Sequence, residues 1–200
     1  MEKVIEITGT AIPLDRSDVD TDQIIPSDWL KRVERTGFEK GLFAEWRDDR
    51  DFVLNQEEYA GAVILVAGPN FGTGSSREHA VWAIQQYGFR AVVSPRFGPI
   101  FRNNASKNGL VCVEVDEATG EALLRSIEEQ PDQVMTIDVR HKVLSAPGAG
   151  ITAEFPLDDS IQMRFLEGLD DISLTLAHEP DIREFEASRP EWMPAAGPPT

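Results

Sequence analysis

The chain has 200 residues, 41% of them apolar and 27% charged, which is ordinary for a globular protein with a hydrophobic core of its own. Its formal net charge of −16 excludes nucleic acid and anionic membrane surfaces as natural partners, because both would repel it. No apolar run reaches the roughly 18 residues that a membrane helix needs, and residues 1–6 lack the apolar stretch of a secretion signal. We therefore expect a cytoplasmic protein.

The N-terminal part predicts one strand and a long loop. Residues 4–8 alternate in character, as in an opening strand. Residues 11–27 contain two prolines and four aspartates and predict a structured loop. Residues 29–35 predict a helical turn ended by Gly37. The segment 41–52 has no clean periodicity, so no structure is assigned to it.

A strand, a helix and a second strand follow with short connections. Residues 62–67 form a short apolar run rich in β-branched side chains, typical of a strand buried on both faces. A glycine-rich turn at 68–74 leads into an apolar helical stripe at 77–87, with Gly88 at the C-cap position. Residues 91–94 predict the second buried strand. This order predicts a right-handed parallel crossover.

The remaining pattern extends the same architecture. We expect four further helices and four further strands: helices at 100–107, 116–129, 161–167 and 181–187, and strands at 110–115, 135–139, 143–145 and 151–155, the last two forming a hairpin. The expected fold class is α/β, with a parallel βαβ core and added antiparallel strands, in one domain spanning 1–187. The proline-rich tail 188–200 is expected to be disordered.

The most informative segment is Gly72-Thr73-Gly74-Ser75-Ser76-Arg77-Glu78-His79. Ser75 and Glu78 have the spacing of a capping box, so the segment is fully explained as a capped helix start. Gly72 and Gly74, however, allow close backbone approach to a ligand, and the first turn of a helix favours an anion. Arg77, in that first turn, adds a bidentate donor for a carboxylate. The residues alone leave both explanations open.

Three known motifs do not fit this segment. A phosphate loop requires a lysine that is missing here. The dinucleotide fingerprint requires glycine where Arg77 stands, and the nucleophile elbow requires glycine at Glu78. What remains is a serine before a helix, beside an arginine, and positive surroundings favour such a serine as a base rather than a nucleophile.

The aspartates Asp18, Asp20 and Asp22 alternate in the long loop. A calcium loop is excluded, because its sixth position would be Gln23 rather than glycine and its twelfth Trp29 rather than glutamate. By themselves these residues predict a solvated loop with local bonds from aspartate to the backbone.

The single cysteine, Cys112, lies in an apolar run and is expected to be buried and inert. One cysteine cannot form an intrachain disulfide, and an iron–sulfur cluster needs about three or four thiolates. We therefore predict no metal or cofactor bound by this chain itself; any such cluster would belong to another chain.

At the level of whole motifs the chain resembles the swivelling domain of the aconitase superfamily, and in particular the separate small subunits of bacterial 3-isopropylmalate dehydratase. The similarity covers nearly everything except the tail. It is carried by the segments GTGSSREHA at 72–80, DVDTDQIIP at 18–26, RTGF at 35–38, LFAEWR at 42–47, DFVLN at 51–55, NGL at 108–110 and GLDDISLTL at 168–176.

The resemblance implies a swivelling β/β/α domain and assigns roles to the site. Ser75 would be the base beside a substrate carboxylate, Ser76 and Arg77 would hold that carboxylate, and Asp22 would orient the catalytic groups. A [4Fe-4S] cluster on a large subunit would act as Lewis acid on the departing hydroxyl. The chain would then be active only with that subunit, as a hydro-lyase of leucine biosynthesis that isomerises 2-isopropylmalate to 3-isopropylmalate.

The resemblance also implies that the loop after the aspartates contacts the variable arm of the substrate. There Leu30 suits an isopropyl group, while Lys31 or Arg32 suits a carboxylate of the 2-hydroxy dicarboxylate substrate; an ordinary amphipathic turn explains these residues equally well. Arg32 and Arg35 both remain candidates for a substrate-binding arginine. Two other functions stay open: the small subunit of a homoaconitase-like hydro-lyase, and a non-catalytic anion-binding regulatory module.

Overall fold

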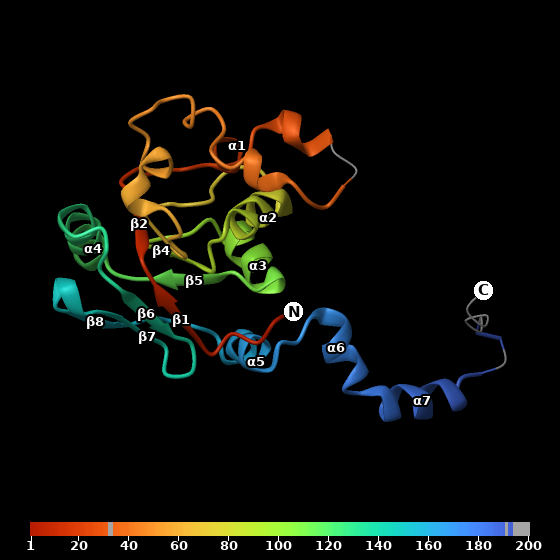
Figure 1. Ribbon diagram of the computed structural model, residues 1–200. Coiled ribbons are helices and arrows are strands. Elements are labelled where there is room, and N and C mark those ends of the chain that lie inside the picture. Colours follow the sequence, from red (N-terminus) through yellow and green to blue (C-terminus); the bar gives the residue numbers. More distant parts are fainter. Residues whose placement is uncertain (32–33, 191, 194–200) are drawn as a thin grey trace.

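The protein is built on two four-stranded sheets, one parallel and one antiparallel (Figure 1). A computed structural model describes residues 1–31, 34–190 and 192–193. The parallel sheet has the strand order β2-β3-β4-β5, and the antiparallel sheet has the order β1-β6-β7-β8. This arrangement confirms the predicted α/β class, with a parallel core and added antiparallel strands.

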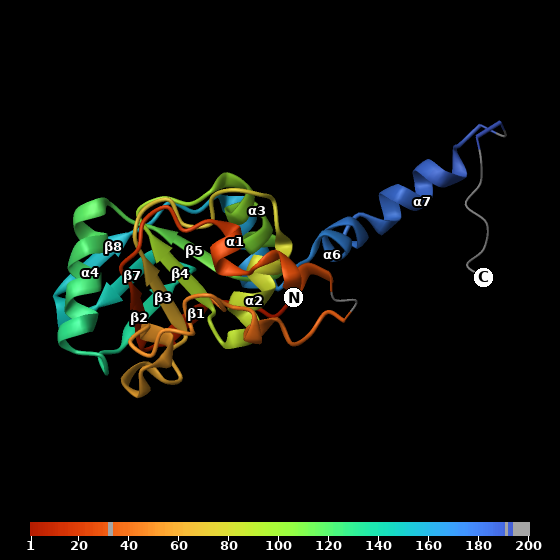
Figure 2. The same cartoon turned by 90° about the horizontal axis from the view of Figure 1, so that it is seen from above.

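The parallel sheet forms the centre of the core. Its strands β3 (Ile64–Ala67), β4 (Ala91–Ser94) and β5 (Val111–Glu114) lie within the predicted segments, and all of their residues except Glu114 are buried. Helix α4 (Glu117–Glu129) covers one side, and α2 (Glu78–Tyr87) and α3 (Pro99–Asn108) cover the other (Figures 1 and 2). Burial on both faces explains the continuous apolar runs of these strands.

The strand β2 (Ala11–Leu14) corrects the prediction of a loop over residues 11–27. It pairs in parallel with β3, with Pro13 opposite Val66. A proline argues against a central strand because it has no backbone N–H to donate. Here it is tolerated because β2 is at the edge of its sheet, where one side of the strand needs no ladder partner.

The antiparallel sheet contains the predicted strands and hairpin. It consists of β1 (Glu6–Gly9), β6 (Met135–Asp138), β7 (Val143–Ala146) and β8 (Ile151–Glu154). β7 and β8 pair antiparallel across a short 3-10 helix at Pro147–Ala149. In β6 and β7 buried positions alternate with half-buried ones, as expected for a sheet with one face on the core.

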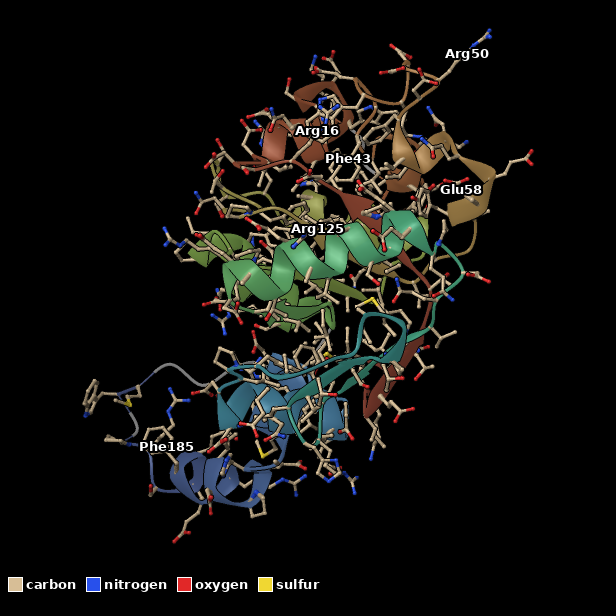
Figure 3. The ribbon with its side chains drawn as sticks, turned by 90° about the vertical axis from the view of Figure 1, so that its left-hand side faces the viewer. Arg16, Phe43, Arg50, Glu58, Arg125 and Phe185 are labelled. Atoms are coloured by element: carbon tan, nitrogen blue, oxygen red, sulfur yellow. The ribbon has the colours of Figure 1, made fainter. Side chains whose placement is uncertain are left out.

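Short helical segments occupy the long connection between β2 and β3 of the parallel sheet. They are α1 (Thr21–Ile24) and the 3-10 helices Ser27–Lys31, Phe38–Lys40, Val53–Asn55 and Glu57–Tyr59. The predicted turn at 29–35 overlaps the first of these 3-10 helices, and residues 32–33 lie outside the described residues. The unassigned segment 41–52 packs through Phe43 and Trp46, with the Arg16 guanidinium 4.1 Å from the Trp46 ring centre (Figure 3).

The C-terminal region extends away from the two sheets. After α5 (Asp159–Glu167), an unpredicted helix α6 (Asp171–Leu176) leads into α7 (Glu179–Ala187), which was predicted from residue 181. Figures 1 and 2 show α6 and α7 projecting from the body. The expected disorder of 188–200 stays a prediction, since residues 191 and 194–200 lie outside the described part. No helix in the described part is long and apolar enough to cross a membrane.

Candidate active site

The glycine-rich segment and the aspartate loop meet at one edge of the parallel sheet. They follow the neighbouring strands β3 and β2, whose carboxyl ends lie side by side. The Gly72 N–H donates to the Val19 carbonyl (2.8 Å), and the Thr21 N–H donates to the Thr73 carbonyl (2.9 Å). Two segments about fifty residues apart in sequence are thus joined through their backbones. The carboxyl edge of a parallel sheet is where open α/β folds place their ligand sites.

Close packing explains the glycines of this region. Gly72 has a φ of 74°, and a Cβ at this position would lie 2.3 Å from Cγ of Phe101. A Cβ on Gly98 would lie 2.2 Å from the carbonyl oxygen of Gly72. No real Cβ contact is that short, so the segment is fixed against α3 by positions that only glycine can occupy.

The predicted capping box of Ser75 and Glu78 is wrong. Helix α2 begins at Glu78, and its N-cap is Arg77, which is extended (φ −129°, ψ 108°) and makes no side-chain cap bond. The sequence predicted Arg77 in the first turn of this helix. In the structure Arg77 instead precedes that turn, as the N-cap residue. The Glu78 carboxylate accepts from the side-chain amide of Asn108 on α3 (2.8 Å). Ser75 and Ser76 thus precede the helix instead of starting it.

A capping box does occur, in the aspartate loop. The Asp20 carboxylate accepts from the Gln23 N–H (2.8 Å), while the Gln23 side chain accepts from the Asp20 N–H (2.9 Å). This confirms the expected bonds between aspartate and backbone in the loop. It also fixes α1, so that Thr21 and Asp22 face the glycine-rich segment.

Both serine side chains of the segment are exposed. Within the described part of the chain, neither hydroxyl has a hydrogen-bond partner, so both remain available to a ligand. The backbone between them is held from the other loop: the buried Thr21 hydroxyl donates to the Ser75 carbonyl (2.9 Å). The resulting arrangement presents two free hydroxyls on a fixed backbone.

Arg77 links the two loops through its side chain. Its Nη1 forms an ion pair with Asp22 and donates to the Ile25 carbonyl (3.4 Å). The Arg77 side chain is 17% exposed and that of Asp22 53% exposed. Both contacts use Nη1, so they leave the other guanidinium donors to a carboxylate ligand. The structure therefore brings together Asp22, Arg77 and the two serines.

The residues predicted to contact the variable arm of the substrate lie only partly near Asp22, Arg77 and the two serines. The 3-10 helix Ser27–Lys31 follows Ile25, so it adjoins the Arg77 end of the site, and Leu30 is half-buried in it. The Lys31 ammonium pairs instead with Asp28 (2.9 Å), with both side chains exposed. Arg32 lies outside the described residues.

Arg35 and His79 are directed to the flank of α2. The Arg35 guanidinium lies 5.7 Å from the centre of the Trp82 ring. The His79 ring lies 4.8 Å from that of Trp82 and 5.3 Å from that of Phe38. His79 therefore packs against these two aromatic rings.

Two positioning residues escaped the sequence analysis. One is Thr21, described above. The other is Ser94, fully buried at the end of β4, whose hydroxyl donates to the Gly68 carbonyl (2.7 Å) where the glycine-rich segment begins. A lone hydroxyl in an apolar run or a loop carries no sequence signal of such a role, because its partner is distant in sequence.

Cys112 is buried on β5, as predicted. Burial raises the pKa of its thiol to about 12, so it stays protonated and is a poor metal ligand at neutral pH. Among the described residues, no three His, Cys, Asp or Glu side chains are grouped to hold a metal ion. The donors that these described residues offer therefore do not fit an iron–sulfur cluster.

Known proteins resemble this chain over nearly its whole length. A family model described as the aconitase C-terminal domain matches residues 1–118, and one described as the C-terminal domain of the 3-isopropylmalate dehydratase small subunit matches residues 171–196. The 3-isopropylmalate dehydratase small subunit of Rubrobacter xylanophilus is 56% identical over 97% of this chain and 98% of its own length. That of Frankia alni is 59% identical over 98% of this chain and 100% of its own.

A solved structure agrees with these matches. The crystal structure of 3-isopropylmalate dehydratase (leuD) from Methanocaldococcus jannaschii superposes with a TM-score of 0.66 at 26% identity, covering 90% of this chain and 99% of the other. This confirms the swivelling-domain fold implied by the sequence motifs. The chain therefore belongs to the aconitase C-terminal domain family, among the small subunits of 3-isopropylmalate dehydratase.

Proposed function

We propose that this chain, together with a large subunit, isomerises 2-isopropylmalate to 3-isopropylmalate by dehydration and rehydration, as a hydro-lyase of leucine biosynthesis in the cytoplasm. The observation that carries the proposal is identity of 55% or more over nearly the full length of both chains with relatives of that name. The segment Ser75–Arg77, with its two exposed serines, gives the proposal its chemistry.

The reaction needs a base beside a carboxylate. Dehydration removes a proton from the carbon next to the one that carries the hydroxyl, and the hydroxyl leaves as water. Rehydration then adds the hydroxyl to the carbon that lost the proton, and the proton to the carbon that lost the hydroxyl. In this proposal the Ser75 oxygen takes and returns that proton. Its support is a free hydroxyl on a fixed backbone, next to the cationic Arg77 and the positive end of α2, both of which favour an oxyanion.

The substrate carboxylate is assigned to Ser76 and Arg77. Arg77 is held by Asp22 and by the Ile25 carbonyl, so its remaining donors have a defined direction before substrate arrives. Such preorganisation lowers the cost of orienting the substrate. Asp22 is thus proposed as a positioning residue for Arg77 in addition to its expected role in orienting catalytic groups.

Leu30 is retained in the proposal as a contact of the isopropyl group, because its 3-10 helix adjoins the Arg77 end of the site. Lys31 is a weaker candidate for a carboxylate contact, since Asp28 already occupies its ammonium. The choice between Arg32 and Arg35 is settled by substituting each and comparing KM for 2-isopropylmalate.

The large subunit is proposed to supply what this chain does not contain. Removing a hydroxyl requires an electrophile, and the proposal keeps the [4Fe-4S] cluster on the large subunit, since the donors described here are unsuited to it. The exposure of Ser75 and Ser76 supports the same division, because a reacting serine needs a partner surface that excludes water from it.

The substrate assay separates this function from its alternatives. The chain is mixed anaerobically with its purified cognate large subunit, and formation of the unsaturated acid is followed from 2-isopropylmalate and from homocitrate. Turnover of isopropylmalate is expected. Turnover of homocitrate alone would favour the homoaconitase-like alternative, and an active complex unaffected by Ser75→Ala would favour the regulatory module.

A further inference from the structure

We propose that the C-terminal arm, formed by α6 and α7 (residues 171–187), docks as an amphipathic element into an apolar groove with a basic rim on the large subunit. The identity of the partner rests on the proposed function above. The docking surface itself is inferred from the burial, charge and placement of the arm.

The arm has almost no support from the body. None of the residues of α6 and α7 is buried. The link to the body runs through Asp171, whose carboxylate contacts Arg164 of α5 (2.5 Å) and Lys107 of α3 (3.8 Å). The ion pair between Arg183 and Glu179 (2.6 Å) stays within α7. A helix of nine residues is unstable alone in water, where about 12–15 residues are needed, so α7 requires a surface to pack against.

The arm presents large apolar side chains to solvent. Ile172 is 71% exposed, Leu176 59% and Phe185 63%, and Figure 3 shows Phe185 outside the packed body. Ile172 and Leu176 are four residues apart, and Ile182 and Phe185 three apart, so each pair lies on one face of its helix. Anchors with this spacing are typical of a helix that binds in an apolar groove.

The charge of the arm selects the partner. Residues 171–187 contain five carboxylates and one arginine, so a complementary groove has a basic rim. A second copy of this chain is disfavoured as the occupant, because it would bring an equally acidic arm on a chain whose own net charge is −16.

The placement of the arm suits a partner that also covers the active site. Figures 1 and 2 both show the arm leaving the body on the side of α2 and α3, opposite α4. The segment Ser75–Arg77 directly precedes α2. One partner surface on this side can therefore cover the exposed serines and continue along the arm.

The test compares the same kind of substitution on and off the arm. Phe185→Glu places a charge on the apolar face of α7, and Met163→Glu does so at an apolar residue of α5 that is 46% exposed. Binding of each full-length variant to the purified large subunit is measured anaerobically by analytical ultracentrifugation. We expect Phe185→Glu to weaken binding at least about tenfold and Met163→Glu to bind as the wild type does.

Equal binding by the wild type and Phe185→Glu, or equal weakening by the two variants, would overturn the docking proposal while leaving the proposed function intact. A dimer of the chain alone that Phe185→Glu dissociates would assign the arm to a second copy and also overturn it. Wild-type chain that binds the large subunit but turns over no isopropylmalate would instead refute the proposed function alone. Wild-type chain that does not bind would refute both.

Discussion

Replacing Gly72 by alanine tests whether close packing fixes the glycine-rich segment. Gly72 has a φ of 74°, and the left-handed region costs a residue with a Cβ about 1–2 kcal/mol. The new Cβ would also lie 2.3 Å from Cγ of Phe101, and overpacking of a core costs about 1–3 kcal/mol. We expect Gly72→Ala to lower the free energy of unfolding by about 2–5 kcal/mol, a large share of the total stability of a domain.

Gly61→Ala is the matched control. Gly61 has nearly the same backbone conformation, with a φ of 80°, but its added Cβ would have no heavy atom within 4 Å. Only the backbone cost of about 1–2 kcal/mol remains. The difference between the two variants therefore isolates the clash with Phe101.

Urea denaturation at constant pH measures both losses, read as shifts of the midpoint at constant slope. The double variant Gly72→Ala with Phe101→Leu closes a mutant cycle, and a smaller side chain at residue 101 should recover part of the loss. Equal destabilisation by Gly72→Ala and Gly61→Ala, or no coupling between residues 72 and 101, would refute the packing explanation.

Three further predictions concern buried or capping groups. Thr21→Val removes the hydrogen bond to the Ser75 carbonyl, so it should lower stability by about 0.5–1.5 kcal/mol and also lower turnover. Thr21→Ser keeps the hydroxyl and should restore turnover; equal turnover of the two variants would contradict the positioning role. Burial raises the pKa of Cys112 to about 12, so a thiol reagent at pH 8 should label it only as fast as the protein unfolds. For the same reason the stability of the folded chain should fall as pH rises from about 9. Rapid labelling of the folded chain would show that the thiol is not buried in this way. Hydrogen bonds from the Thr119 side chain and backbone lower the pKa of Asp116, the N-cap of α4. The cap therefore contributes stability above about pH 3.9 that is lost as pH falls further. Urea midpoints at pH 6 and pH 3 should differ less in Asp116→Asn than in the wild type, and an equal loss of stability at pH 3 in both would contradict the assignment.

The sequence predicted the buried strands of the parallel sheet well, because β3, β4 and β5 show their burial as continuous apolar runs bounded by glycine or proline. It missed β2 because Pro13 and the following aspartates imitate a loop. Because β2 pairs in parallel with β3, the loops that follow the two strands lie at the same edge of the sheet. Without β2, the sequence could not predict the contact between Asp22 and Arg77.

The false capping box has a similar cause. Local spacing favoured Ser75 as the cap of α2, but the contacts that keep the chain extended through Arg77 come from Thr21 and Asp22, which are more than fifty residues away in sequence. Pairwise spacing cannot report such contacts. The roles of Ser75, Ser76 and Arg77 came from the family resemblance, and the geometry now gives them a physical basis to test.

The central claim is that Ser75 and its neighbours form one half of an active site, and that a large subunit provides the other half. The most direct measurement is an anaerobic titration of the purified large subunit with wild-type chain and with Ser75→Ala, recording binding and the rate of 2-isopropylmalate dehydration together. We predict no turnover by either subunit alone, turnover on mixing, and unchanged binding by Ser75→Ala with turnover lower by about 10³ or more. Turnover by that variant within about tenfold of the wild type, well short of the loss that follows removal of a catalytic residue, would contradict the claim.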